Sequence, residues 1–285
     1  MSKLKIAIQK KGRLSERSLG LLKECGINIS NDTGKLKASA NNFPIEILFL
    51  RDDDIPHYVE QQVVDVGILG ENEVFEKNKL VDVVEQLGFA SCRLSLAIPK
   101  EEHYTGLGFF NAKRIATSYP KILAEFLQKN NIRAEIEEIS GSVEIATGIG
   151  LADAIFDIVS TGSTLFTNGL AEVEAVCKSQ AVLIRSKNLS GWQGEILDRL
   201  LFRIRAVRNA KENKYILLNA PNEKIAAICK ILPGMKSPTI LPLADKSWSS
   251  LHSVIREDDF WEVIDRLKEA GAQGILVAPI EKMIL

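Results

Sequence analysis

Short apolar runs alternate with helix-like segments through the first two-thirds of this chain. Residues 4–8 alternate apolar and other side chains as a strand does, and residues 14–25 place apolar side chains on one face of a helix. Residues 45–50 and 66–69 have the composition of strands, with a helical segment at 55–64 between them. This β-α-β order is typical of a mostly parallel sheet covered by helices.

A second series of the same kind begins near Arg93. Its strands are predicted at residues 93–98, 114–117, 134–139 and 154–159, and its helices at 119–130, at 141–151 and after Thr164. The chain is expected to return to the first series near residues 173–185. We therefore predict an α/β fold of two lobes with a cleft between them. Lobe I comprises residues 1–90 and about 179–208, and lobe II comprises residues 91–178.

The last quarter of the chain has a different order. A long amphipathic helix is predicted at residues 191–210, and the polar stretch 209–214 is the best candidate for a linker. We then predict a strand at 215–219, a helix at 223–231, strands at 239–241 and 249–255, a helix at 258–270 and a strand at 274–278. This β-α-β-β-α-β order is that of the ferredoxin-like fold, and it predicts a separate domain over residues 212–285.

Composition excludes several classes of protein. Hydrophobic residues make up 46% of the chain and charged residues 26%, which is the balance of a globular protein, and the net charge of −1 argues against a nucleic-acid partner. No apolar stretch approaches the ~20 residues that cross a bilayer, and the first residues do not resemble a secretion signal, so we expect no membrane partner and a cytoplasmic location. Four cysteines stand singly, which argues against a zinc site and a disulfide framework.

The strongest motif lies where the predicted strand 154–159 ends. The five residues Ser160-Thr161-Gly162-Ser163-Thr164 come next and lead into a helix. Small hydroxyl side chains and a glycine expose successive backbone N–H groups, a geometry that binds phosphate. Asp153 and Asp157 lie nearby, where they could bind sugar hydroxyls or help hold a phosphate-bound Mg²⁺. The alternative is an ordinary strand-to-helix turn in which a hydroxyl caps the helix.

Three other predicted strands also end in polar or glycine-containing segments. These are residues 9–14, which include Lys10, Gly12 and Arg13, residues 51–56, which include three consecutive aspartates, and residues 67–72. Ligands of open α/β sheets bind at such strand ends. A solvated basic turn and simple helix capping remain the alternatives for the first two. Together these segments favour a protein that binds a phosphorylated sugar or a nucleotide.

From Gly150 to Leu165 the chain resembles the phosphoribosyl-diphosphate loop of the ATP phosphoribosyltransferase family, which catalyses the first step of histidine biosynthesis. The resemblance covers nearly the whole chain, including residues 9–14, 51–56, 67–72, 92–97, 113–120, 237–243 and 280–283. The C-terminal module makes the chain similar to the long, histidine-regulated form. The resemblance implies two periplasmic-binding-protein-like lobes and a ferredoxin-like (ACT-like) regulatory domain.

The resemblance also implies a reaction. Phosphoribosyl would pass from phosphoribosyl diphosphate to N1 of the adenine of ATP, with release of pyrophosphate and with Mg²⁺ as cofactor, held mostly through the substrate. No protein nucleophile is required, because the substrate carries its own leaving group and the protein mainly aligns two anions. Histidine is the implied feedback inhibitor, AMP a further ligand, and a homo-hexamer in equilibrium with dimers the implied assembly.

The same resemblance implies roles for individual residues. Phosphoribosyl diphosphate is expected at Asp153, Ala154, Asp157, Ser160, Thr161, Gly162, Ser163 and Thr164. ATP is expected at Gly12, Arg13, Leu14, Arg51, Asp53, Asp54 and Glu71. The expected catalytic residues are Lys10, Arg13, Asp153 and Asp157, and the last two are the candidate protein ligands of Mg²⁺. Regulatory histidine is expected at Asn219, Thr239, Leu241, Ser249 and Ser253.

Other functions remain open at this point. A two-lobed fold serves binding as well as catalysis, so a solute-binding protein and an amino-acid sensor are alternatives. A base-salvage phosphoribosyltransferase would use a free base in place of ATP. The C-terminal module could also be purely structural or oligomerising. Pyrophosphate release that depends on ATP would separate the proposed enzyme from these alternatives.

Overall fold

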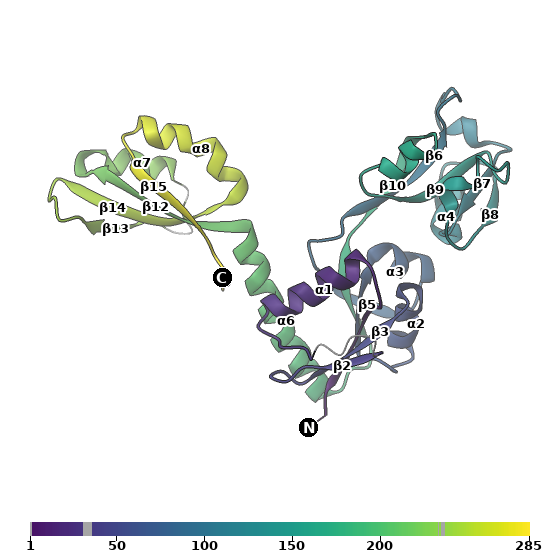
Figure 1. The fold of residues 1–285 in the computed structure, drawn as a ribbon, viewed down its shortest axis with the longest axis horizontal. Helices are drawn as coiled ribbons and strands as arrows, with labels where there is room; N and C mark the ends of the chain where they lie inside the picture. The colour runs from purple at the N-terminus through teal and green to yellow at the C-terminus, as the bar shows by residue number, and fades with distance from the viewer. Residues whose placement is uncertain (1, 31–35, 233, 235–236) are drawn as a thin grey trace. The chain divides into compact units, whose positions relative to one another are not determined.

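The structure is a computed structural model that describes residues 2–30, 36–232, 234 and 237–285 (Figure 1). Residue contacts divide the chain into two compact units. The first comprises Met1–Lys23 and Ile27–Leu197, and the second comprises Glu24–Gly26 and Asp198–Leu285. The first unit holds both predicted lobes, and the boundaries proposed for the lobes and for the third domain stay predictions.

Lobe I is built on a six-stranded sheet with the strand order β2-β3-β1-β4-β11-β5. Its strands are Leu4–Gln9 (β1), Lys37–Ser39 (β2), Ile45–Leu50 (β3), Val66–Gly70 (β4), Val81–Gln86 (β5) and Ala181–Ser186 (β11). Its helices are Arg13–Glu24 (α1), Asp52–Asp54 (η1), Ile55–Glu60 (α2) and Glu71–Lys77 (α3). Strand β1 lies parallel between β3 and β4, and β11 runs antiparallel to β4 and β5. The carboxyl end of β1 is therefore a switch point, where open α/β sheets bind ligands.

Lobe II repeats this plan on a five-stranded sheet in the order β10-β6-β9-β7-β8. Its strands are Cys92–Pro99 (β6), Arg114–Thr117 (β7), Glu135–Glu138 (β8), Ala154–Val159 (β9) and Leu170–Ser179 (β10). Its helices are Leu107–Phe110 (η2), Pro120–Lys129 (α4), Val143–Ile145 (η3) and Ser163–Thr167 (α5). Strand β7 lies parallel between β8 and β9, while β6 pairs antiparallel with β9 and β10.

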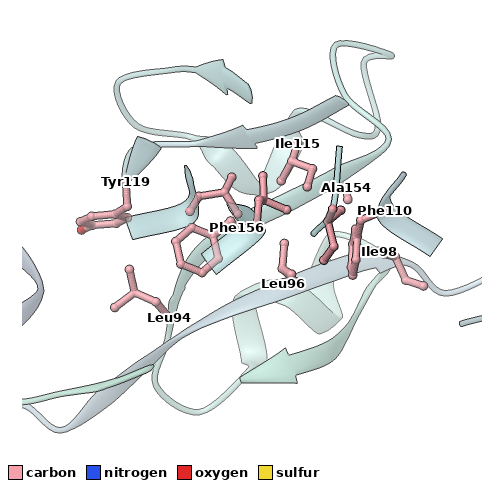
Figure 2. Close-up of a cluster of buried hydrophobic side chains, with 11 residues drawn as sticks. Leu94, Leu96, Ile98, Phe110, Ile115, Tyr119, Ala154 and Phe156 are labelled. Carbon is pink, nitrogen blue, oxygen red and sulfur yellow. The ribbon is translucent and has the colours of Figure 1, made fainter. Parts of the chain in front are cut away.

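One face of the lobe II sheet packs on an apolar core (Figure 2). Leu94, Leu96 and Ile98 alternate along β6 and meet Phe156 of β9 and Phe110 of η2. Each of these side chains is almost completely removed from solvent, and burying one large apolar side chain stabilises a fold by about 1.5–3 kcal/mol. This core holds β9 rigidly, and β9 carries the predicted phosphate loop at its carboxyl end.

The second unit contains most of a long helix and a four-stranded sheet. Helix α6 spans Gly191–Glu212 and begins in the first unit. The sheet, in the order β13-β14-β12-β15, is entirely antiparallel, and α7 and α8 cover one of its faces (Figure 1). Its elements are Asn213–Pro221 (β12), Asn222–Lys224 (η4), Ile225–Ile231 (α7), Thr239–Pro242 (β13), Trp248–Arg256 (β14), Glu257–Glu269 (α8) and Gln273–Pro279 (β15). The α/β class and the β-α-β-β-α-β order are confirmed.

Two expectations about local structure are wrong. Residues 209–214 are not a linker, because α6 continues to Glu212 and β12 begins at the next residue. Ala210, Lys211 and Glu212 favour helix, and the Asn213 side chain donates to the Asn209 carbonyl oxygen at 2.7 Å, which ties the junction together. The segment 141–151 forms only the short 3-10 helix η3 (Val143–Ile145) followed by turns, and Gly141, Ser142 and Gly150 adopt positive φ angles.

Candidate functional site

The predicted phosphate loop follows the carboxyl end of β9, a central strand of the lobe II sheet. Ser160, Thr161, Ser163 and Thr164 are exposed or partly exposed, and Gly162 has a φ angle of +81°, which is the left-handed conformation that glycine adopts freely. The hydroxyls of Thr161 and Ser163 lie 3.0 Å apart. Helix α5 has only five residues, and the first N–H groups of any helix have no partner within it. The loop can therefore present hydroxyl and N–H donors to an anion.

An ion pair within the sheet supports this loop. The Arg93 guanidinium of β6 forms a two-pronged contact with the Glu172 carboxylate of β10, and Ser95 also donates to that carboxylate at 2.7 Å. Arg93 then donates to the Ser160 carbonyl oxygen at 3.3 Å. The Arg93 contact holds the pKa of Glu172 below its usual range, so the pair stays charged near neutral pH. This contact positions the first residue of the loop.

Asp153 lies at the opposite end of β9. Its carboxylate accepts a hydrogen bond from the Arg114 backbone N–H at 2.8 Å, and its own N–H donates to the Arg114 carbonyl oxygen at 2.9 Å. The seven residue steps from Asp153 to Ser160 form an extended path of about 23 Å at ~3.3 Å per residue. This placement does not support the prediction that Asp153 faces the same ribose as the loop, and Asp153 ties β9 to β7 instead.

Asp157 lies three residues before the loop and opposite Ser95 of β6. Burial raises the pKa of its carboxyl to about 6, and the nearby Glu144 adds to this effect. Ala154, at the start of β9, is completely buried in the sheet, which does not support its predicted substrate contact. Of the acidic and apolar residues predicted on β9, only Asp157 lies near the loop.

Lobe I brings its own predicted residues to the carboxyl edge around β1. Lys10 and Gly12 are exposed between β1 and α1, Arg13 is exposed at the start of α1, and Leu14 is partly exposed in its first turn. Gly12 has a φ angle of +98°, which lets the chain turn directly from strand into helix. The Lys10 backbone N–H donates to the Leu50 carbonyl oxygen at 2.8 Å, which joins this turn to the end of β3.

The three aspartates after β3 form η1 and divide their roles. The Gln9 amide donates to the Asp52 carboxylate at 3.1 Å, which links the ends of β1 and β3. The Arg51 guanidinium pairs with Asp53 at 3.3 Å, and Asp54 is exposed. Glu71 begins α3 at the end of β4, and its backbone N–H donates to the Gln180 carbonyl oxygen at 2.9 Å. The predicted ATP-side residues therefore come from the ends of three adjacent strands.

Sequence reasoning missed a group of buried polar residues beside this edge. Asn72, Glu73 and Glu76 of α3 are buried, and the Asn72 amide donates to the Tyr119 hydroxyl of lobe II at 3.3 Å. Burial and the neighbouring Asp52 raise the pKa of Glu73 to about 7. Burial, Glu73 and Asp157 raise the pKa of Tyr119 well above its usual range. Of this group, only Asn72 and Tyr119 fall within segments that the family resemblance covers.

The described residues offer no ready-made metal site. Nowhere in the described part of the chain do three or more His, Cys, Asp or Glu side chains gather closely enough to hold a metal ion. Asp153 and Asp157 are four residues apart on an extended path, which is about 13 Å at ~3.3 Å per residue. This spacing does not favour the two aspartates as ligands of one Mg²⁺ ion, and a contact of either one with a substrate-bound Mg²⁺ stays a prediction.

The residues predicted to bind histidine divide between the two faces of the C-terminal sheet. Asn219 and Leu241 both pair with Ser250, and Thr239 pairs with His252, so all three share the face away from the helices. Ser249 and Ser253 alternate along β14 with Ser250 and His252, so they face the helices, and both are buried. Because side chains alternate along a strand, the five predicted residues lie on two faces of the sheet, and their binding of histidine stays a prediction.

Similarity to known proteins decides the family. A family model described as ATP phosphoribosyltransferase matches residues 51–206, and one described as HisG, C-terminal domain, matches residues 210–282. An ATP phosphoribosyltransferase of Cytophaga hutchinsonii is 59% identical over 281 residues, covering 99% of this chain and 98% of the relative. This chain belongs to the ATP phosphoribosyltransferase family. A second ATP phosphoribosyltransferase, from Azobacteroides pseudotrichonymphae, is 61% identical and covers 99% of this chain and 100% of the relative.

Solved structures agree with the family on the fold. The ATP phosphoribosyl transferase (HisG:HisZ) complex from Thermotoga maritima superimposes with a TM-score of 0.62 at 27% identity, over 71% of this chain and 96% of that one. The substrate-binding protein of an amino acid ABC transporter gives a TM-score of 0.50 at 12% identity, over 73% of this chain and 94% of that one. The expectation of two periplasmic-binding-protein-like lobes in an ATP phosphoribosyltransferase is confirmed.

One finding concerns membranes. In the part of the chain that the structure describes, no helix combines the length and the apolar character needed to cross a bilayer.

Proposed function

We propose that this chain transfers the phosphoribosyl group of phosphoribosyl diphosphate to N1 of the adenine of ATP, with phosphoribosyl diphosphate on lobe II and ATP on lobe I. Membership of the ATP phosphoribosyltransferase family supports the reaction. The observation that carries the placement is the exposed hydroxyl and glycine loop 160–164, which ends a central strand of lobe II. No comparable loop of small hydroxyl residues comes after the described strands of lobe I, where Lys10, Arg13 and Arg51 supply cations instead.

The chemistry needs alignment and charge more than proton transfer. The N1 lone pair attacks C1 of the ribose, the bond from C1 to the diphosphate oxygen breaks, and pyrophosphate carries that electron pair away. N1 of adenine bears no proton, so the attack needs no general base. Asp157, buried three residues before the loop, would face the positive charge that develops on the ribose. Its raised pKa means that this role needs a pH above about 6.

Mg²⁺ is proposed to arrive with the substrates. A divalent cation on the diphosphate neutralises the leaving group, and the described carboxylates do not form a cage for it. Lys10, Arg13 and Arg51 are proposed to neutralise the phosphates of ATP together with that cation. No step of the proposed reaction uses a metal held by protein side chains alone.

The deciding experiment is a rate assay on the full chain. ATP, phosphoribosyl diphosphate, Mg²⁺ and a pyrophosphatase are mixed with the protein, and formation of phosphoribosyl-ATP is followed by its ultraviolet absorbance. We expect a rise that requires both substrates. Replacing ATP by free adenine tests the base-salvage alternative. If the absorbance does not rise with folded protein and both substrates, the solute-binding alternative is favoured instead.

We also propose that histidine inhibits the enzyme from the open face of the C-terminal sheet. Asn219, Thr239, Ser250 and His252 share this face, and the His252 ring lies 2.6 Å from the Tyr215 hydroxyl and 3.2 Å from the Ser250 hydroxyl. Histidine should lower the rate of the wild-type chain, and Asn219→Ala should weaken that inhibition. Ser249→Ala, on the helix-facing side of the same sheet, is the control. Equal inhibition of Asn219→Ala and wild type would rule out this face.

The remaining family properties stay proposals. AMP is proposed as a second inhibitor, and a homo-hexamer in equilibrium with dimers as the assembly in the cytoplasm. The Thermotoga maritima relative was solved as a HisG:HisZ complex, which concerns that protein. Light scattering of this chain with and without histidine measures its own assembly.

A further inference from the structure

Helix α4 of lobe II begins without a capping side chain of its own. Tyr119 occupies the N-cap position and makes no side-chain cap, and the first helical residue is Pro120, which has no N–H group. The next two N–H groups, of Lys121 and Ile122, need acceptors from elsewhere because the first turn of a helix offers none. The Leu123 N–H reaches the Tyr119 carbonyl oxygen at 3.1 Å.

Glu76 of lobe I supplies both missing acceptors. One carboxylate oxygen accepts from the Lys121 N–H and the other from the Ile122 N–H, each at 3.1 Å. Glu76 is only 4% exposed, although it lies 45 residues from Lys121 in the sequence. The negative carboxylate also lies at the positive end of the α4 dipole. A buried carboxylate without such donors would be strongly destabilising, so the contact favours one arrangement of the two lobes.

A second contact between the lobes involves the start of the same helix α3. The Asn72 backbone N–H donates to the Ser179 hydroxyl at 3.0 Å, and that hydroxyl donates back to the Asn72 side-chain oxygen at 2.8 Å. The Asn72 amide also donates to Tyr119, the residue just before α4. Ser179 ends β10 and Ala181 begins β11, so this contact sits where the chain passes from lobe II back to lobe I.

Apolar packing between α3 and α4 is incomplete beside these polar contacts. A hollow of about 380 Å³ lies between them, lined by Val74 of α3 and Asn78 just after it, by Ile122 and Glu125 of α4, and by Cys177. A space of this size leaves few dispersion contacts to hold the two helices at one angle. The directional hydrogen bonds of Glu76 and Asn72 are therefore specific constraints on how these two helices meet.

We propose that Glu76 is a positioning residue, which sets the angle between the two lobes by capping α4 and so aligns ATP on lobe I with phosphoribosyl diphosphate on lobe II. This inference rests on the proposed function, because it matters for rate only if the two substrates bind on different lobes. The reacting atoms must approach to about 3–3.5 Å, and a misplacement of about 1 Å costs on the order of a hundredfold in rate. Two hydrogen bonds at 3.1 Å define the lobe angle on that scale.

The test compares three variants of the full chain. Glu76→Gln keeps the shape but places an amide NH₂ group against one of the two N–H donors. Glu76→Asp keeps the charge on a shorter side chain. Glu125→Gln makes the same charge change at an exposed position of α4 and is the matched control. For each variant we would measure kcat, the dissociation constant of each substrate alone, and amide hydrogen exchange at Lys121 and Ile122.

We expect Glu76→Gln to lower kcat at least about tenfold and to leave the dissociation constant of each substrate within about twofold of wild type. Amide hydrogen exchange at Lys121 and Ile122 should become faster in this variant. Glu76→Asp should be intermediate, and Glu125→Gln should behave like wild type. An unchanged kcat would overturn the proposal, and so would a loss confined to the affinity for one substrate, which indicates damage within one lobe. If Glu76→Gln fails to fold, Glu76→Asp decides by the same criteria. A wild-type chain without activity would instead refute the proposed function, while hydrogen exchange would still report whether Glu76 caps α4.

Discussion

The two sheets of the first unit share a strand order but differ at the carboxyl ends of their strands. In lobe I the strands β3, β1, β4 and β11 lie side by side, and in lobe II the strands β8, β7, β9 and β6 occupy the equivalent places. After β4 the chain continues directly into α3 with Glu71, whereas after the equivalent β9 it forms the hydroxyl loop 160–164. The repeated sheet determines where ligand groups gather, and the strand-end residues determine which ligand each lobe suits.

The charges at the two edges sharpen this difference. Lobe I presents Lys10, Arg13 and Arg51 beside the aspartates of η1, while the lobe II loop carries no charged side chain. A loop of N–H and hydroxyl donors suits one compact phosphate, whereas separated cations suit a longer and more mobile polyphosphate. Substitutions at each edge should therefore affect one substrate and spare the other.

The largest effect is expected from a substitution within the loop. Proline cannot adopt the φ angle of +81° found at Gly162, because its ring holds φ near −65°, and it also removes an N–H donor. Gly162→Pro should raise the KM for phosphoribosyl diphosphate at least about a hundredfold, equivalent to about 2.7 kcal/mol of binding, and leave the KM for ATP nearly unchanged. Steady-state kinetics with each substrate varied in turn measures both values.

A matched pair of alanine variants separates loop geometry from general strain. Gly162 and Gly150 both have positive φ angles, and a Cβ atom at either would meet no atom within 4 Å. Each alanine therefore adds only backbone strain of about 1–2 kcal/mol. Gly162→Ala should raise the KM for phosphoribosyl diphosphate by about tenfold, whereas Gly150→Ala should leave it unchanged. Equal KM values for the two variants would refute the assignment of the loop.

The next effect concerns the support of the loop. Arg93→Met removes the donor to the Ser160 carbonyl oxygen and leaves Glu172 without its partner. Losing a charged hydrogen bond costs about 1.5–3 kcal/mol, and we expect about a tenfold rise in the KM for phosphoribosyl diphosphate. Arg114→Met is the control, because Arg114 makes a similar contact with the Gly150 carbonyl oxygen at 3.2 Å, away from the loop. If both variants raise this KM alike, Arg93 has no special role.

Contiguous patterns explain which features could be predicted from the sequence. The loop after β9 is a single run of small residues, and the alternating segments predict the C-terminal order and most strands of the two lobe sheets, although β2 and β5 of lobe I are missed. Which face of a sheet a side chain occupies needs the register of the strands, and this is why the sequence alone could not divide Asn219 from Ser249. Contacts between distant segments, such as Glu76 on α4 and Arg93 on Ser160, have no local signature in one sequence.

An effect of another kind, on stability rather than on KM, is expected at the lobe I edge. The pKa of Glu73 rises from 4.5 to about 7 in the folded chain, so the folded state holds a proton that the unfolded state releases between these values. Stability contributed by neutral Glu73 is therefore greatest below pH 4.5 and falls as the pH rises to 7, by up to about 3 kcal/mol. Urea unfolding of wild type and Glu73→Gln at pH values from about 5 to 8 measures this loss.

Glu73→Gln is neutral at every pH and should show a flatter profile over this range. Glu71→Gln, two residues earlier on α3, retains Glu73 and should keep the wild-type slope. The charge of Lys77 opposes the rise in the pKa of Glu73, and Asp53 and Tyr119 also influence that pKa. Both variants keep these three groups, so the comparison isolates Glu73. If the free energy of unfolding changes with pH at the same slope in all three proteins, Glu73 is already ionised at the acid end of the range.

The smallest effect is expected at Asp153, at the far end of the strand that carries the loop. Asp153→Ala removes one hydrogen bond, to the Arg114 N–H, and should lower the free energy of unfolding by about 1 kcal/mol while leaving both KM values within about twofold. Asp157→Asn keeps the shape of the residue beside the loop but removes its charge, so it should lower kcat. The two aspartates are four residues apart along the same strand path, so this pair of variants tests whether position along β9 decides function. A large loss of kcat in Asp153→Ala, with stability unchanged, would mean that the substrate reaches the opposite end of the sheet.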